Sequence, residues 1–162
     1  MSKGKKIAII VLVIVLVVFL AIGLVFMHFN KDKEMISADE FKEVLESKDY
    51  RIHDITKKFE VYDHYMKKAY VAEKDNLFFE FYELFDVDKA VDMYKTNEDA
   101  LIEAKGKSSK EVHKSFKNYE THYVKDHKNY MYISRVGNTI FYVNAPASFA
   151  DDIDDVIEKL GY

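Results

Sequence analysis

KKAYVAEKDNLFFEFYELF, residues 67–85, has the pattern of two strands joined by a short turn in this 162-residue chain. Its two halves, 67–74 and 77–85, have the length of strands and are separated by Asp75 and Asn76. Both of these residue types tolerate the positive φ angles that a two-residue turn requires. The stretch therefore predicts a β-hairpin.

The register of this hairpin follows from the length of its turn. Lys68 is expected to face Glu83 across the two strands, and Tyr70 to face Phe81. Because side chains alternate between the faces of a strand, one face of the second strand is expected in the core. The residues of that face are Leu77, Phe79, Phe81 and Phe85.

A long helix is expected after the hairpin, capped by Asp86 and ending near Gly106. The residues that follow, 105–117, contain five lysines and one glutamate and are interpreted as an exposed loop. The expected buried stripe of the helix is Val87, Ala90, Val91, Tyr94 and Leu101.

A helix and a short strand are expected before the hairpin. Ser37 and Glu40 have the spacing of a capping box, which predicts a helix that ends near Lys48. Residues 50–55 favour a strand. Residues 56–66 suit a helix as well as a strand or loop, because their apolar spacing fits both.

Three strands and a closing helix are expected towards the end of the chain. A tight turn at Gly137 and Asn138 joins the last two strands. Ser148 is expected to cap the helix, and Gly161 to end it. The expected strands are 119–126, 129–136 and 139–144.

These elements predict an α+β fold, since antiparallel hairpins pack with helices in that class. The expected sheet is antiparallel, with about five to six strands and three helices in the order α-β-β-β-α-β-β-β-α. Ten positions separate Asn76 from Asp86, and ten also separate Asn138 from Ser148. An internal duplication and the common rules of hairpin formation both explain this similarity.

Ahead of this fold, residues 7–26 (IAIIVLVIVLVVFLAIGLVF) are apolar, without charge or proline. About 20 such residues, at about 1.5 Å each, span a hydrocarbon core of about 30 Å. A transmembrane helix from Ile7 to Phe29 is therefore expected. A cleaved signal peptide is the alternative, with residues 21–23 as its only small-x-small site, but signal peptides have shorter apolar regions of about 7–15 residues.

The orientation of the expected helix follows from the lysines at its two ends. Lys3, Lys5 and Lys6 precede it, whereas Lys31 and Lys33 follow it. The positive-inside rule then predicts a single-pass protein of the cell membrane with a cytosolic N-terminus. The expected parts are a cytosolic tail at 1–6, a span at 7–29, a tether at 30–36 and an extracytoplasmic domain at 37–162.

Composition excludes several classes of partner and chemistry. Three of the 24 basic residues and none of the 28 acidic residues precede the apolar run, which leaves 21 basic against 28 acidic residues after it. An acidic domain does not suit nucleic acid, whose phosphates require a basic surface. The absence of cysteine excludes disulfides, thiolate catalysis and cysteine-ligated metals.

The sequence contains no GxSxG, GxxxxGK[ST], GxGxxG or HExxH motif, and no catalytic residue or cofactor is predicted. The candidates for metal binding are histidines next to an acidic residue, as at His53 and His127, and His122, which is five positions from His127. Because neighbours on a strand point to opposite faces, a surface or structural role is the simpler interpretation. The candidate metal ligands are His53, His122, Asp126 and His127.

Tyrosines gather in the last three expected strands. Tyrosine combines a large ring with a polar tip, which suits a binding surface for a peptide or glycan. The alternative is that tyrosine is simply a good strand former at half-buried positions. The candidate binding residues are Tyr119, Tyr123, Tyr130 and Tyr132, with Tyr142 nearby.

The apolar run, SADEFKEVLESKDY, AEKDNLFFEFYELFD and VGNTIFYVN together resemble single-pass, membrane-anchored proteins of Gram-positive bacteria that carry one small, uncharacterised extracytoplasmic domain. The resemblance implies a location and an α+β domain, and it assigns no functional residues. The first hypothesis is a non-enzymatic binding or interaction module whose partners are the lipid bilayer and another membrane or envelope protein. The alternatives are a metal-assisted hydrolase of the cell envelope and a self-associating structural membrane subunit, so the oligomeric state stays open.

Overall fold

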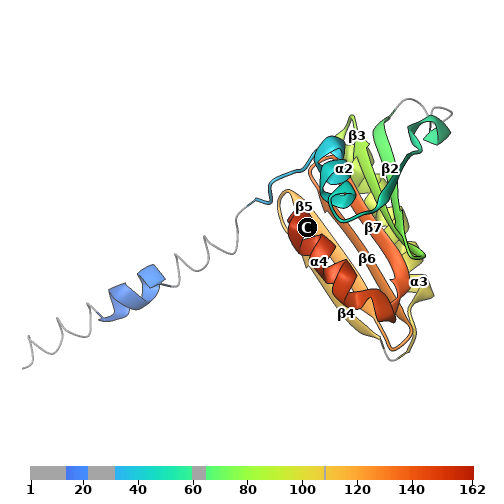
Figure 1. Cartoon of the computed structure of the whole chain (residues 1–162). Helices are drawn as coiled ribbons and strands as arrows, with labels where there is room; N and C mark the ends of the chain where they lie inside the picture. Colours follow the sequence, from blue (N-terminus) through green and yellow to red (C-terminus); the bar gives the residue numbers. More distant parts are fainter. Residues whose placement is uncertain (1–13, 22–31, 60–64, 108) are drawn as a thin grey trace, which may run out of the picture. The chain divides into compact units, whose positions relative to one another are not determined.

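The computed structural model describes residues 14–21, 32–59, 65–107 and 109–162 (Figure 1). The chain divides into two compact units, Met1–Asp32 and Lys33–Tyr162. In the first unit, residues 14–21 are helical. The other residues of the expected span from Ile7 to Phe29 lie outside the described ranges. Within those ranges, no helix is both long enough and apolar enough to cross a bilayer.

The second unit is an α+β fold, which confirms the predicted fold class. Its antiparallel sheet has seven strands in the order β1-β2-β3-β7-β6-β5-β4. The strands are β1 Arg51–Asp54, β2 Met66–Lys74, β3 Leu77–Leu84, β4 Lys110–Ser115, β5 Tyr119–Lys125, β6 Asn129–Val136 and β7 Thr139–Pro146. The helices are α2 Ala38–Glu46, α3 Val87–Ala104 and α4 Ala150–Leu160, with short 3-10 helices at Thr56–Phe59 and Ala147–Phe149.

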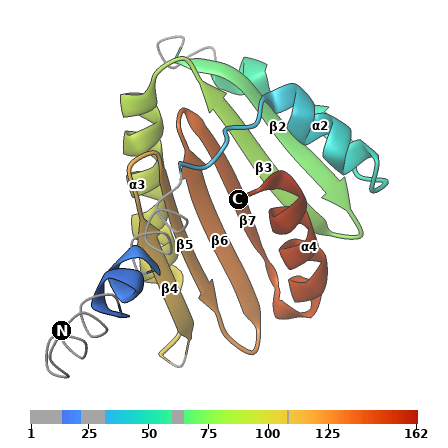
Figure 2. The same cartoon turned by 90° about the vertical axis from the view of Figure 1, so that its left-hand side faces the viewer.

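The helices form two layers with the sheet between them. Helices α2 and α4 cover one face and α3 covers the other (Figures 1 and 2). On the first face, Phe41 of α2 stacks on Phe81 at a ring-centroid distance of 4.8 Å. On the second face, the buried side chains of Tyr94 and Leu101 from α3 pack with Ile133 of β6. Each face of the sheet therefore has its own apolar core.

The predicted hairpin is confirmed in its turn and in its register. Asp75 and Asn76 both have positive φ, and Lys68 pairs with Glu83 as Tyr70 pairs with Phe81. Leu77, Phe79 and Phe81 are buried as expected, but the prediction for Phe85 is wrong, since that residue is 67 % exposed. The strand ends at Leu84, so the alternation of faces does not extend to Phe85.

The Glu83 carboxylate connects this hairpin to helix α2, next to a register shift in β2. The shift lies between Met66 and Lys68. Although Lys68 is the backbone partner of Glu83, the ammonium group of Lys67 contacts the buried Glu83 carboxylate at 2.5 Å. The other oxygen of this carboxylate accepts the backbone N–H of Ala38, the first residue of α2, at 3.2 Å. One buried charge thus joins three elements.

The prediction of five to six strands is wrong because residues 105–117 are not only a loop. They contain β4, which forms the edge of the sheet, so the order is α-β-β-β-α-β-β-β-β-α. Every residue of β4 except Val112 is exposed. Lysines on an exposed edge strand discourage pairing with other chains, and the same lysines give this strand the composition of a loop.

The helix caps agree only in part with the sequence. The capping box of Ser37 and Glu40 is present, and Asp86 caps α3. Ser148 does not cap α4, which begins at Ala150 after a 3-10 turn and has no side-chain cap. Gly161 ends α4 in the left-handed conformation, as expected.

Three further expectations concern helix surfaces, an ambiguous segment and the repeat. Val87, expected in the buried stripe of α3, is 50 % exposed, because it is the first residue of the helix and the stripe begins one turn later at Ala90. Thr56–Phe59 is a 3-10 helix, whereas residues 60–64 lie outside the described ranges. The two hairpin-and-helix segments that are similar in sequence end in α3 and α4, and these helices lie on opposite faces of the sheet (Figure 2).

Candidate ligand-binding pocket

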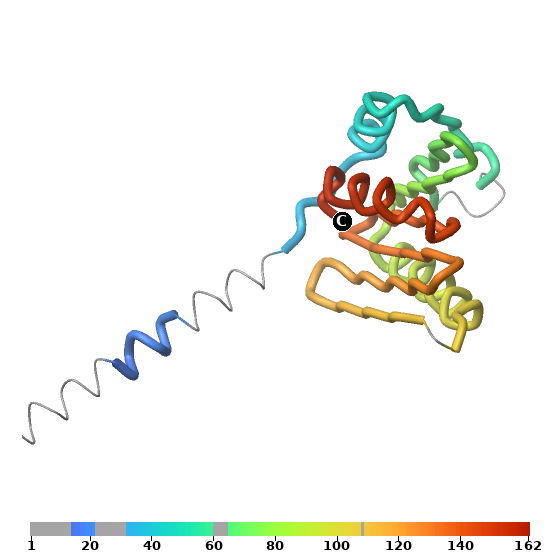
Figure 3. Tube along the Cα trace, turned by 60° about the horizontal axis from the view of Figure 1, so that its bottom comes forward, coloured from blue at the N-terminus to red at the C-terminus, as the bar shows by residue number. Residues whose placement is uncertain are grey.

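A pocket of about 250 Å³ lies on the sheet face that carries α2 and α4. Helix α4 leaves β4 and β5 uncovered on this face (Figures 2 and 3). Strands β4 to β6 form the floor of the pocket, and α4 forms one wall. The pocket is lined by Lys33, Val112, Lys114, Tyr119, Thr121, Tyr123, Tyr130, Tyr132, Asp154, Ile157 and Tyr162.

The alternation of side chains along β5 explains why tyrosines gather here. Tyr119, Thr121 and Tyr123 are two residues apart, so all three face the pocket. Tyr123 pairs with Tyr132 of the neighbouring strand, and its ring stacks with that of Tyr130 at a centroid distance of 6.1 Å. The four tyrosines that the sequence indicates are therefore brought together in one pocket.

Tyr142 does not belong to this group. It lies in β7 and packs against the core on the α3 face of the sheet. Seven lining residues were not indicated by the sequence, and Lys33, Lys114 and Tyr162 are three of them. Lys33 and Lys114 fall in segments interpreted as a tether and a loop, and Tyr162 follows the closing helix, so only the folded chain brings them to the tyrosines.

Hydroxyl groups and one carboxylate form the polar part of the lining. The Tyr130 hydroxyl donates to Asp154 Oδ1 at 2.6 Å, and the Thr121 and Ser134 hydroxyls are 2.8 Å apart. Burial, together with the Asp154 hydrogen bond, raises the pKa of Tyr130, and burial raises the pKa of Tyr132 to about 12. Both hydroxyls are therefore protonated at neutral pH and serve as donors.

Two lysines form the basic end of the pocket. The ammonium nitrogen of Lys33 lies 5.0 Å from the centroid of the Tyr119 ring, within the range of a cation–π contact. Asn118 holds the Lys33 backbone through two hydrogen bonds of 3.1 and 2.7 Å. Burial, reinforced by the nearby charge of Lys114, lowers the pKa of Lys33. Among the described residues, no carboxylate forms an ion pair with Lys33 or Lys114.

The four candidate metal ligands are not brought together. His53 lies in β1, at the opposite edge of the sheet, and contacts Glu73 at 3.0 Å. Asp126 accepts two backbone N–H groups in the turn that also contains the exposed His127, and His122 points to the α3 face. Over the part of the chain that the structure describes, no three acidic or histidine side chains could hold a metal ion.

His122 instead links three elements on the α3 face. It is 3 % exposed, and its Nδ1 and Nε2 atoms lie 2.7 and 2.9 Å from carboxylate oxygens of Glu98 and Glu111. Glu98 belongs to α3 and also contacts His113 at 3.4 Å, whereas Glu111 belongs to β4. The hydrogen bond from Lys105, together with the bond to His122, lowers the pKa of Glu111. The edge strand is thus attached to the helix beneath it through one buried side chain.

Replacing His122 with glutamine is expected to lower the free energy of unfolding by about 1.5–3 kcal/mol, the usual contribution of a hydrogen bond to a charged group. Urea unfolding of the full chain in mild detergent measures this effect. His53→Gln is the matched control, because His53 is more exposed and contacts a single carboxylate. Equal effects of the two substitutions would contradict a structural role for His122.

Comparison with known proteins does not assign a function, so the proposal below rests on the geometry of the pocket. No protein-family model matches the chain, and neither curated proteins nor solved structures show a significant match.

Proposed function

We propose that this protein is a membrane-anchored, extracytoplasmic binding module, non-enzymatic, whose ligand occupies the tyrosine-lined pocket. The observation that carries the proposal is the convergence of Tyr119, Tyr123, Tyr130 and Tyr132 on one pocket. Its lining offers groups for recognition: aromatic rings, protonated hydroxyls and two ammonium groups. Small-molecule sites combine apolar walls with a few placed polar groups in the same way.

The membrane anchor is supported by the character of the first unit. Seven consecutive apolar side chains, those of residues 14–20, are each 45–70 % exposed in a helical segment. A helix that is apolar on all sides is stable in a lipid or protein interior and is costly in water. The segment lies in the middle of the apolar run from Ile7 to Phe26, whose length suits a bilayer.

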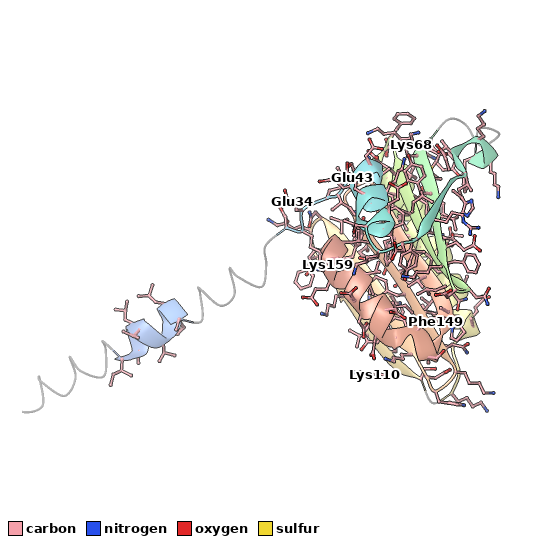
Figure 4. All side chains as sticks on the ribbon, viewed as in Figure 1. Glu34, Glu43, Lys68, Lys110, Phe149 and Lys159 are labelled. Atoms are coloured by element: carbon pink, nitrogen blue, oxygen red, sulfur yellow. The ribbon has the colours of Figure 1, made fainter. Side chains whose placement is uncertain are left out.

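The connection between anchor and pocket is short. Four residue steps separate Phe29, the expected outer end of the span, from Lys33, and they reach at most about 14 Å. Figure 4 labels Glu34, the residue that follows Lys33, where the chain enters the second unit. With the span in a bilayer, the pocket is held close to the membrane surface. Its ligand then comes from that surface or diffuses to it.

Site-specific photo-crosslinking in intact cells tests this proposal. A benzophenone amino acid at position 123, within the pocket, is expected to give an adduct with another cell component. The same group at Phe78 is the control, because Phe78 lies in β3 outside the pocket and is 43 % exposed. Identical adducts from both positions would contradict binding in the pocket. Adducts that contain only this chain would favour the self-associating subunit instead.

A further inference from the structure

We propose that the ligand of this pocket is an organic phosphate ester, with its phosphate between Lys33 and Lys114 and its hydroxylated body along the rings of Tyr123 and Tyr130. This inference rests on the proposed binding function and adds the chemical class of the ligand. One class covers two sources, the headgroup of a membrane lipid and a soluble sugar or polyol phosphate.

The first step is the pair of ammonium groups at one end of the pocket. Lys33 enters from the start of the domain, and Lys114 lies in β4 opposite Thr121. The partial burial of Lys33 and, to a lesser extent, the repulsion from Lys114 both disfavour the charged form of Lys33. Neither lysine has an ion-pair partner among the described residues. An anion bound between the two lysines would compensate both positive charges. A pair of ammonium groups of this kind is a suitable environment for a phosphate.

The second step is the separation of this end from the acidic residue of the pocket. Asp154 contacts Tyr130, which pairs with Lys125 at the far end of β5. Tyr119 and Lys125 are six positions apart, or about 20 Å along the strand. In addition, the Lys125 ammonium group lies 5.0 Å from the Tyr130 ring and offsets part of the negative charge there. The Asp154 carboxylate is therefore engaged by Tyr130, whose position on the sheet is at the opposite end of β5 from Tyr119.

The third step is the size and character of the pocket between these ends. A volume of about 250 Å³ equals roughly eight water molecules at about 30 Å³ each, which suits a phosphate with one small ring or polyol. Tyrosine rings provide flat apolar surface, and their hydroxyls, with Asp154, provide hydrogen-bonding groups for a hydroxylated body. A phosphate monoester carries a charge of about −1.5 to −2 at pH 7, which matches two lysines, whereas the phosphodiester of a lipid headgroup carries about −1 and would leave one lysine charge in excess.

Calorimetric titration of the full chain in lipid nanodiscs tests the inference. In phosphatidylcholine nanodiscs, glucose 1-phosphate is expected to bind, inorganic phosphate to bind more weakly, and glucose to give no measurable binding. Lys114→Gln and Lys33→Gln are each expected to weaken glucose 1-phosphate binding about tenfold. Lys159→Gln is the control of equal charge change, because Lys159 lies on α4 outside the pocket lining (Figure 4). It is expected to change the affinity less than about twofold.

A second series of nanodiscs distinguishes the two sources. If anionic headgroups occupy the pocket, adding phosphatidylglycerol to the nanodiscs lowers the apparent affinity for glucose 1-phosphate, and Lys114→Gln removes this competition. If the ligand is soluble, the affinity is the same in both lipid compositions. Absence of glucose 1-phosphate binding, or binding that Lys33→Gln and Lys114→Gln leave unchanged, would overturn the phosphate inference.

The crosslinking experiment separates failure of this inference from failure of the proposed function. An adduct at position 123 that persists in the Lys33→Gln/Lys114→Gln double variant leaves the binding module in place and rejects the phosphate. Loss of the adduct in that variant, with an intact fold by circular dichroism, supports the phosphate. Absence of any specific adduct in the unmodified background rejects both.

Discussion

Replacing Phe141 with alanine is expected to lower the free energy of unfolding by about 3–5 kcal/mol, the usual cost of removing a buried phenylalanine side chain. Phe141 is fully buried at the centre of the core on the α2 and α4 face. Its ring contacts Phe79 at a centroid distance of 5.6 Å, Tyr132 at 6.0 Å and Tyr162 at 5.5 Å. The Phe41 ring is a fourth neighbour at 6.4 Å, so alanine would leave a cavity that borders four aromatic rings.

Urea unfolding of the full chain in mild detergent, followed by far-ultraviolet circular dichroism, measures the loss. Phe85→Ala is the matched control, because Phe85 lies beyond the end of β3 with most of its surface in water. A change of less than about 0.5 kcal/mol is expected there. If Phe141→Ala costs no more than Phe85→Ala, the assignment of the core to this face is wrong.

Phe141 also links the core to the pocket. Tyr132 and Tyr162, which both line the pocket, contact its ring. A smaller side chain at position 141 would allow both tyrosines to shift into the core. Ligand affinity is therefore expected to fall together with stability in this variant.

The elements that the sequence predicts well are those whose signals are local. The hairpin around Asp75 and Asn76 was predicted in its exact register, because the turn length determines which residues pair. The capping box at Ser37 and the terminal glycine at Gly161 are equally local signals. Each of these signals depends only on residues a few positions apart in the sequence, so packing against other elements does not alter it.

The errors occur where an element's environment determines its structure. Strand β4 has no alternating apolar residues, because it is an exposed edge held by pairing with β5 and by the contact between Glu111 and His122. Phe85 and Val87 lie where a strand period of two changes to a helical period of 3.6, and neither period holds at the junction. Ser148 lies within a 3-10 turn, Ala147–Phe149, that moves the start of α4 to Ala150.

The site shows the same distinction. Tyr119 and Tyr123 lie on one face of a strand, which alternation alone predicts, and β6 brings its tyrosines beside them. Lys33 is 86 residues from Tyr119 in the chain, and its position depends on two bonds to Asn118. No local pattern contains that information. The partners of His122 are likewise 24 and 11 residues away.

Deleting residues 2–29 is expected to release the protein from the membrane completely. The deletion removes about 20 apolar residues, and each buried CH₂ group contributes about 0.8 kcal/mol to partition into lipid. The full chain is expected to remain in the membrane pellet after extraction at alkaline pH, whereas the deleted chain stays in the supernatant. Deletion of residues 2–6 alone is the control and is expected to leave the protein in the pellet. Extraction of the full chain by alkali would contradict a transmembrane anchor.

We propose that the pocket is exposed at the outer surface of the membrane. The chain has no cysteine, so a single introduced cysteine reports its own accessibility to a membrane-impermeant maleimide. Lys114→Cys places the thiol at the pocket, and Ser2→Cys places it in the expected cytosolic tail. On intact cells, labelling of position 114 is predicted without permeabilisation, and labelling of position 2 only after it. The reverse pattern, or labelling of neither position before permeabilisation, would contradict an extracytoplasmic location of the pocket.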